Sequence, residues 1–472
     1  MRRISRNLFI ILCTTITFVL AACGGPTVTE PVAEEEDDTA STTEIAEDEA
    51  VETPAEESPT DAPMEEAATE AEEAPQSRAT VVPEDTTSDE GSTEEVSANL
   101  TEGCVETYDE SVDYFPEKAS IEYSTGWEVE YFNNYKVINV LNPWRDADVT
   151  FQYVLVQCGT PAPEGFDDAQ IVEVPIDTIV TMSTTQLPQL VGLDRVDRLI
   201  GHDDFQNINT PEVLDRIEAN EMTEVGVGAS TNVELLLDLE PDLVMTYGLG
   251  DPQSDVHPQL IEAGLSVALN SSYMENSPLG RAEWLKFTGA FFNDEGRAAE
   301  VFEGMATEYN ALAEQATAMT DKPTVFVNAP FEGTWFMAGG KSYMAQYLAD
   351  AGANYLWADD ESTGSQQLSF EVVFDRAADA DFWVNTSIWT SLDEALAADE
   401  RFGDFAAFQN GTVYNNNARL NNFGGNDYWE TGVSNPQLVL ADLIKIFHPD
   451  LLPNHELYFY QQLPQSSEGA DS

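Results

Sequence analysis

Histidine, the side chain most often used for acid–base catalysis and metal binding, occurs only at His202, His257, His448 and His455. None of the four stands in an HExxH pattern or in another spacing typical of metal ligands. The sequence also lacks a GxSxG elbow, a P-loop and a dinucleotide fingerprint. We therefore predict a protein that is not an enzyme, with no catalytic residue, no metal ligand and no cofactor.

Aromatic, amide and hydroxyl side chains instead gather in the segments that follow short apolar runs. Loops in such positions are typical of binding sites, and this mixture of groups suits a bulky, flat ligand with polar edges. The residues predicted to contact a ligand are Thr184, Tyr247, Tyr273, Trp335, Trp389, Asn416, Arg419, Asn422, Tyr428 and Trp429. Arg419, one of few basic residues, is expected to meet an anionic group. The alternative for each aromatic residue is a place in the core.

The beginning of the chain has the order of a secretory signal. Arg2, Arg3 and Arg6 precede an apolar stretch from residue 8 to residue 20, which is too short for a spanning helix. The following Leu-Ala-Ala-Cys resembles the bacterial lipobox, which implies cleavage after residue 22 and acylation of Cys23. We expect an extracytoplasmic protein that is anchored by lipid to the outer face of the cytoplasmic membrane. The alternative is an ordinary cleaved signal with an incidental cysteine.

Charge divides the rest of the chain. The protein has 87 acidic and 19 basic residues, and its net charge of −68 argues against binding to nucleic acid. Residues 23–100 are mostly Glu, Asp, Thr, Ala, Ser and Pro, so we predict a disordered acidic linker. In an oxidising compartment, the remaining cysteines Cys104 and Cys158 could form a disulfide.

The body is predicted to contain two α/β lobes. A β-rich lead-in segment with a hairpin (residues 101–170) is followed by an N-terminal lobe (171–278), in which strands and helices alternate. Residues 279–320 then hold an uninterrupted amphipathic helix from Glu295 to about Met319, and a C-terminal α/β lobe (321–465) completes the chain. The fold class is α/β, with two lobes joined by one long interlobe helix. Loops after parallel strands are expected to face the crevice.

Three segments resemble the class III substrate-binding proteins of ferric-siderophore, haem and cobalamin importers. They are Asn232–Val244, Arg281–Phe292 and Leu440–Pro449. The resemblance covers roughly residues 110–465 and implies a monomer that holds its ligand in a cleft and delivers it to an ABC permease. A ferric siderophore is the first expectation, with cobalamin or haem as the alternative. A direct metal-ion binder is disfavoured, because it would need several converging histidines and carboxylates.

The resemblance also implies docking residues. Asn232-Val233-Glu234 and Ser369-Phe370-Glu371 each place a capping residue two positions before a glutamate in the first turn of a helix. In the family, a surface glutamate of each lobe meets arginines of the transporter. Glu234 and Glu371 are therefore expected to contact the permease, although the helix dipole favours glutamate there in any case.

Overall fold

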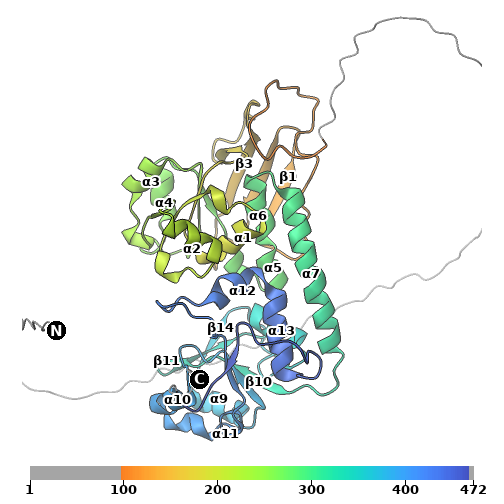
Figure 1. The fold of residues 1–472 in the computed structure, drawn as a ribbon, viewed down its shortest axis with the longest axis vertical. Helices are drawn as coiled ribbons and strands as arrows, with labels where there is room; N and C mark the ends of the chain where they lie inside the picture. The colour runs from red at the N-terminus through yellow and green to blue at the C-terminus, as the bar shows by residue number, and fades with distance from the viewer. Residues whose placement is uncertain (1–96, 467–472) are drawn as a thin grey trace, which may run out of the picture. The chain divides into compact units, whose positions relative to one another are not determined.

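The computed structural model describes residues 97–466, in which a β-sheet precedes two α/β lobes (Figure 1). The expected signal peptide, the acylated Cys23 and nearly all of the acidic linker lie outside the described residues. Among the helices of residues 97–466, none is both long enough and apolar enough to cross a membrane.

The lead-in segment is a four-stranded sheet. Side by side, its strands are β1 (Trp127–Tyr131), β2 (Tyr135–Val140), β3 (Phe151–Gln157) and β4 (Gln170–Val174). The first three are antiparallel, as their alternating sequences predict, whereas β4 pairs parallel to β3 and was not expected. The sheet therefore continues past the predicted boundary at residue 170. A disulfide between Cys104 and Cys158, with Cα atoms 4.7 Å apart, ties the preceding chain to the end of β3.

Buried charges fasten this sheet to the long helix. Lys136 on β2 forms an ion pair with Glu295 and donates to Asn293 Oδ1 at 3.0 Å, and the side chains of Lys136 and Glu295 are fully buried. Burial lowers the pKa of Lys136, while the Glu295 carboxylate acts in the opposite direction. Because removing one partner would leave a buried charge without compensation, the pair fixes the sheet at the start of the helix.

The N-terminal lobe is built on a five-stranded parallel sheet. In spatial order its strands are β7 (Thr223–Glu224), β6 (Leu199–His202), β5 (Ile179–Thr181), β8 (Leu243–Thr246) and β9 (Val267–Leu269). The helices between them are α1 (Leu187–Gly192), α2 (Pro211–Glu218), α3 (Val233–Leu239) and α4 (His257–Glu262). Strands β5, β8 and β9 are buried along their whole length, as their continuous apolar sequences require.

Three helices join the lobes. They are α5 (Pro278–Ala282), α6 (Trp284–Phe291) and α7 (Glu295–Thr317). Every residue of α6 is buried, whereas α7 buries one face through residues such as Phe302 and Tyr309. At 23 residues, α7 is about 35 Å long. Figure 1 shows α7 running from beside the lead-in sheet to the C-terminal lobe, where α13 (Pro436–Phe447) packs along it.

The C-terminal lobe has a larger and a smaller sheet. The larger, in spatial order, comprises β13 (Asn354–Tyr355), β10 (Thr324–Val327), β15 (Phe382–Val384), β16 (Val413–Asn415) and the antiparallel β17 (Gln461–Gln462). The smaller comprises β11 (Pro330–Phe331), β12 (Thr334–Ala338) and β14 (Ser365–Leu368). The helices other than α13 are α8 (Tyr343–Asp350), α9 (Phe370–Ala377), α10 (Leu392–Ala398), α11 (Ala406–Asn410) and α12 (Thr431–Ser434).

The predicted fold class is confirmed: two α/β lobes are connected through a helical segment that contains one long helix, α7. The helix expected from Glu295 to about Met319 ends two residues earlier, at Thr317. The sequence analysis did not identify β6, β7, β13, β17 or the small sheet β11–β12–β14. These strands are two to five residues long, which is too short for an alternating pattern to stand out.

Candidate functional site

A cleft of about 1480 Å³ lies between the two lobes, and the lead-in sheet adds residues to its rim. Six parallel strands end at it, because the lining residues Thr184, Leu249, Tyr273, Asn328, Asn385 and Asn416 follow β5, β8, β9, β10, β15 and β16. The carboxyl ends of parallel strands leave backbone groups and loop side chains free to meet a ligand, so this is where a binding site is expected.

The N-terminal wall holds Thr184 and Tyr273. Thr184 lies in a short turn after β5, where the hydroxyl of Ser183 caps the turn by accepting from Thr185 N. Tyr273 donates its hydroxyl to the carbonyl of Gly248 at 2.6 Å, which fixes the ring at the edge of the cleft. Burial raises the pKa of Tyr273 to about 12, so the hydroxyl stays protonated at physiological pH.

The C-terminal wall carries asparagines at the ends of its strands. Asn328 and Asn385 have φ angles of 65° and 60°, a left-handed conformation that asparagine tolerates better than most residues. Asn385 is 7% exposed, and its Oδ1 atom has no hydrogen-bond partner among the described residues. A buried acceptor without a partner is costly, so a ligand donor at this place would be stabilised.

Exposed apolar side chains concentrate at the same cleft. Of the sixteen large apolar residues that are exposed within residues 97–466, seven line it: Leu249, Tyr273, Phe331, Phe336, Ile388, Leu420 and Trp429. Phe331 and Ile388 are 68% and 83% exposed. A concentration of exposed apolar side chains in one cleft of so acidic a protein marks a place that a ligand or partner covers.

The rim is completed by the loop Leu141–Thr150 between β2 and β3, which we call the arginine loop. Its residues Asn142, Trp144, Arg145, Asp146 and Ala147 line the cleft. Among all the lining residues, the charged side chains are Arg145, Asp146 and Glu275. The Glu275 carboxylate is already bound inside the protein, because it accepts from Gly126 N at 2.8 Å and Trp284 Nε1 at 3.1 Å.

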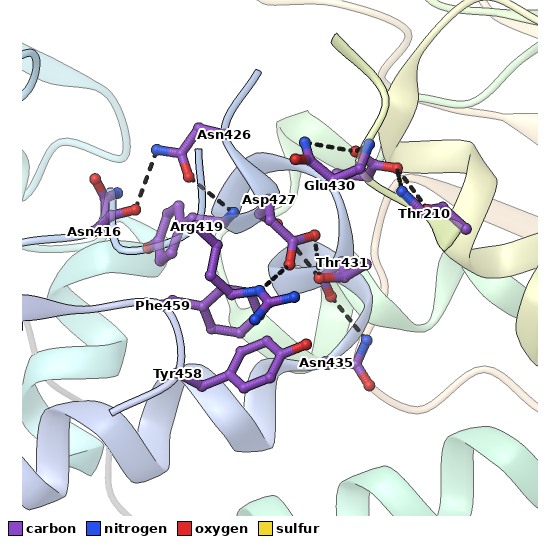
Figure 2. A network of polar contacts seen from close by, with 12 residues as sticks. Thr210, Asn416, Arg419, Asn426, Asp427, Glu430, Thr431, Asn435, Tyr458 and Phe459 are labelled. Carbon is purple, nitrogen blue, oxygen red and sulfur yellow. Dashed lines mark hydrogen bonds and ion pairs between the residues drawn. The ribbon is translucent and has the colours of Figure 1, made fainter. Parts of the chain in front are cut away.

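The second polar loop at the rim, Asn416–Glu430, is called the amide loop below. Figure 2 shows that its polar groups bind one another and the N-terminal lobe. Glu430 is 1% exposed, and its carboxylate accepts from the backbone N–H groups of Asn209 at 2.7 Å and Thr210 at 2.8 Å, just before α2. Burial raises the pKa of Glu430, while these donors oppose the shift. The carboxylate therefore links the amide loop to the N-terminal lobe.

Arg419 does not line the cleft, contrary to expectation. Its Nε atom donates to Asp427 Oδ2 at 2.8 Å, and its guanidinium lies 4.3 Å from the centre of the Tyr458 ring (Figure 2). Asp427 is buried and needs this counter-charge, so the arginine is held within its own loop.

The structure also places four predicted aromatic residues and one amide away from the cleft. Trp335, Trp389 and Tyr428 are buried in the C-terminal lobe, where Trp335 Nε1 donates to the carbonyl of Val327 at 2.9 Å. Tyr247 is half-buried and Asn422 is exposed, and neither is among the lining residues. For each of these five residues, a residue one or two positions away lines the cleft instead. They are Phe336 for Trp335, Ile388 for Trp389, Trp429 for Tyr428, Leu249 for Tyr247 and Leu420 for Asn422.

Of the ten residues expected to contact a ligand, the structure brings Thr184, Tyr273, Asn416 and Trp429 to the cleft. The sequence analysis missed the arginine loop because it lies in the lead-in segment, far along the chain from both lobes. A signal was present there, since Asn-Pro-Trp-Arg interrupts the alternation between two strands as turn residues do.

The two glutamates expected to dock are exposed in the first turns of α3 and α9. The cap of each helix is as expected: Asn232 accepts from Leu235 N, and Ser369 accepts from Val372 N. Hydrogen bonds from the helix N-terminus lower the pKa of Glu371, which also pairs with Arg401 at 3.2 Å. Within residues 97–466, Glu234 has no such ion pair.

Residues 179–420 match the sequence model of a family described as periplasmic binding protein. An uncharacterized lipoprotein of Methanocaldococcus jannaschii is 24% identical over 366 residues, which cover 72% of this chain and 84% of the relative. A second uncharacterized lipoprotein of that organism is 26% identical over 327 residues, which cover 66% and 80%. A solved structure described as a possible iron-binding (periplasmic solute-binding) protein from Staphylococcus epidermidis is 16% identical, with a TM-score of 0.48 and coverage of 58% of this chain and 98% of that one.

Proposed function

The chain belongs to the periplasmic binding protein family, whose members bind solutes and catalyse no reaction, and we propose that it captures a ferric siderophore for an ABC importer. The observation that carries this proposal is the cleft of about 1480 Å³, where exposed apolar side chains meet the ends of six strands. This volume exceeds the range of about 300–1,000 Å³ of ordinary small-molecule sites, which favours a bulky ligand.

The charges of the cleft favour a chelate with little net charge. Arg145 is the one cation among the lining residues of the described chain, and Asp146 stands next to it. A catecholate complex of iron(III) keeps a large negative charge, whereas the oxygens of a hydroxamate complex balance the charge of the metal. Holding a strongly anionic complex in so acidic a protein would require several compensating cations. We therefore propose a ferric hydroxamate.

A corrinoid such as cobalamin is the second candidate, and a specific observation favours it. Eight asparagines line the cleft: Asn142, Asn207, Asn276, Asn328, Asn385, Asn416, Asn417 and Asn426. Amides both donate and accept hydrogen bonds, so they match the carboxamide groups at the edge of a corrin ring. In residues 97–466 no group of three or more His, Cys, Asp or Glu side chains could hold a metal ion.

Tryptophan fluorescence tests the proposal, because Trp144 and Trp429 line the cleft. A ferric hydroxamate should quench the emission saturably with a Kd of about 1 μM or tighter, and a ferric catecholate should bind much more weakly. The iron-free hydroxamate and a ferric aminocarboxylate serve as controls. Tighter binding of cobalamin or haem would replace the siderophore, and no saturable binding of any of these chelates would contradict the proposal.

We further propose that Cys23 carries the lipid that holds the protein at the outer face of the cytoplasmic membrane. The support is the Leu-Ala-Ala-Cys sequence after the apolar segment. Anchoring by a multiply acylated cysteine is firm, because each buried methylene group adds about 0.8 kcal/mol. Cys23→Ala should release the protein from membranes, as cell fractionation would show. An unchanged membrane fraction would contradict lipid attachment.

For delivery, we propose that Glu234 and Glu371 dock on the permease through paired arginines, one from each lobe. Exposure of both carboxylates in equivalent first turns supports this role. Arg401 already pairs with Glu371, so a permease arginine would have to share that carboxylate. The double variant Glu234→Ala/Glu371→Ala should keep its ligand affinity and lose uptake in cells. Glu303→Ala, which removes an exposed carboxylate on α7, is the control and should leave uptake unchanged. Normal uptake by the double variant would contradict docking.

A further inference from the structure

The arginine loop lies outside residues 179–420, the part of the chain that matches the family. We propose that this loop is a third wall of the binding site and that Arg145 binds a carboxylate group at the edge of the chelate. The inference rests on the proposed function and deepens it, because it adds one acidic substituent to an otherwise nearly neutral ligand.

The loop is fixed to the N-terminal lobe by its tryptophan and proline. The Trp144 ring packs closely over two glycines: a Cβ atom on Gly248 would lie 2.7 Å from the ring, and one on Gly250 would lie 2.6 Å from it. Ser271 Oγ donates to the carbonyl of Pro143 at 3.0 Å. The ring also lies 5.6 Å from that of His257, centre to centre. These contacts hold the backbone of the next residue, Arg145, in place.

From this anchored position, Arg145 reaches the opposite lobe. A Cβ atom on Gly364 would lie 2.6 Å from a terminal nitrogen of the Arg145 guanidinium, so a side chain at Gly364 would collide with it. Gly364 precedes β14 and lines the cleft. The guanidinium of Arg145 therefore lies against the C-terminal lobe, while the backbone of its loop is held by the N-terminal lobe.

The Arg145 guanidinium has no ion pair or side-chain hydrogen bond within residues 97–466, and the residue is exposed. Most other arginines of this part of the chain pair with a carboxylate, as Arg195 does with Asp294, and Arg281 instead lies over the Tyr343 ring. In a protein with 87 acidic residues, a cation without a partner that faces a cleft is available to a ligand. A carboxylate matches the planar fork of guanidinium donors, which can bind both of its oxygens at once.

A matched pair of probes tests this role. The terminal amine of ferrioxamine B, a ferric hydroxamate, can be acylated with acetic anhydride to give a neutral group or with succinic anhydride to give a carboxylate. The wild-type protein should bind the succinyl chelate about tenfold more tightly than the acetyl chelate, the range for a charge-assisted hydrogen bond. Arg145→Ala should bind both with the affinity of the acetyl form, and Arg145→Lys should keep part of the preference.

Arg297→Ala is the control, because it removes one exposed positive charge on α7, away from the cleft. It should keep the full preference for the succinyl chelate. If wild-type protein binds both chelates equally, or if Arg145→Ala keeps the preference, the role of Arg145 is overturned while the proposed function stands. If wild-type protein binds neither chelate but binds cobalamin, the siderophore is overturned as the ligand. The role of Arg145 then stands only if the wild-type protein, and not Arg145→Ala, prefers a monocarboxylic acid of cobalamin to cobalamin itself. Binding of no chelate at all overturns both proposals.

Discussion

The arginine loop and the amide loop both border the cleft, and each carries one arginine among polar residues. In the amide loop, Arg419 pairs with Asp427, and Glu430 binds backbone N–H groups of the N-terminal lobe. In the arginine loop, Trp144 anchors the backbone while Arg145 remains without a partner in the described chain. A high density of polar side chains therefore does not identify the groups that meet a ligand. The groups available to a ligand are the polar groups that have no hydrogen-bond or ion-pair partner within the protein.

The largest expected effect is on the amide loop. Glu430→Ala would leave the N–H groups of Asn209 and Thr210 without their buried acceptor, so the free energy of unfolding should fall by about 3 kcal/mol. Urea denaturation measures this change. Glu303→Ala removes an exposed carboxylate on α7 and should change the free energy by less than about 0.5 kcal/mol. Equal effects of the two substitutions would mean that Glu430 does not join the amide loop to the N-terminal lobe.

A smaller effect, on affinity alone, is expected at the apolar rim. The double variant Phe331→Ala/Ile388→Ala removes two highly exposed side chains that line the cleft. Affinity for a bulky chelate should fall about tenfold or more, because each side chain would lose apolar area buried by the ligand. Stability in urea should not change. Phe423→Ala is the matched control, since Phe423 is 73% exposed but does not line the cleft. A loss of affinity in the control alone would place the ligand elsewhere.

The smallest effect is expected at Arg419. Arg419→Ala should change the affinity for the succinyl chelate by less than about twofold, because the guanidinium binds Asp427 and lies outside the cleft. Isothermal titration calorimetry measures both this variant and Arg145→Ala. A tenfold loss in Arg419→Ala with no loss in Arg145→Ala would reverse the roles assigned to the two loops.

The sequence was sufficient to predict that the loops after six parallel strands border the cleft, because short apolar runs revealed those strands and ligands bind at strand ends. It was not sufficient to predict which residue of each loop faces inward. Successive residues of a strand point to opposite faces, so Trp335 entered the core while Phe336 reached the cleft. Outside the strands, too, buried Trp389 and Tyr428 each stand next to a residue that lines the cleft, Ile388 and Trp429. Only packing against the rest of the lobe decides between such neighbours.

The pairing of Arg419 with Asp427 was equally hidden from the sequence. The two residues are eight positions apart in an irregular loop, and no helical or strand period relates them. Arg145 could not be assigned to the cleft because the lead-in sheet meets the lobes through contacts between residues distant in the chain, such as the pair of Lys136 with Glu295. Patterns within short segments do not report such contacts.

The most direct test of the account is the position of the bound metal. Crystals grown with the ferric hydroxamate should give an anomalous scattering peak for iron in the cleft, in the space bordered by Trp429, Phe331 and the arginine loop. For a corrinoid, the peak would come from cobalt at the same place. A well-ordered chelate bound elsewhere on the protein, with the cleft filled only by solvent, would contradict the central claim.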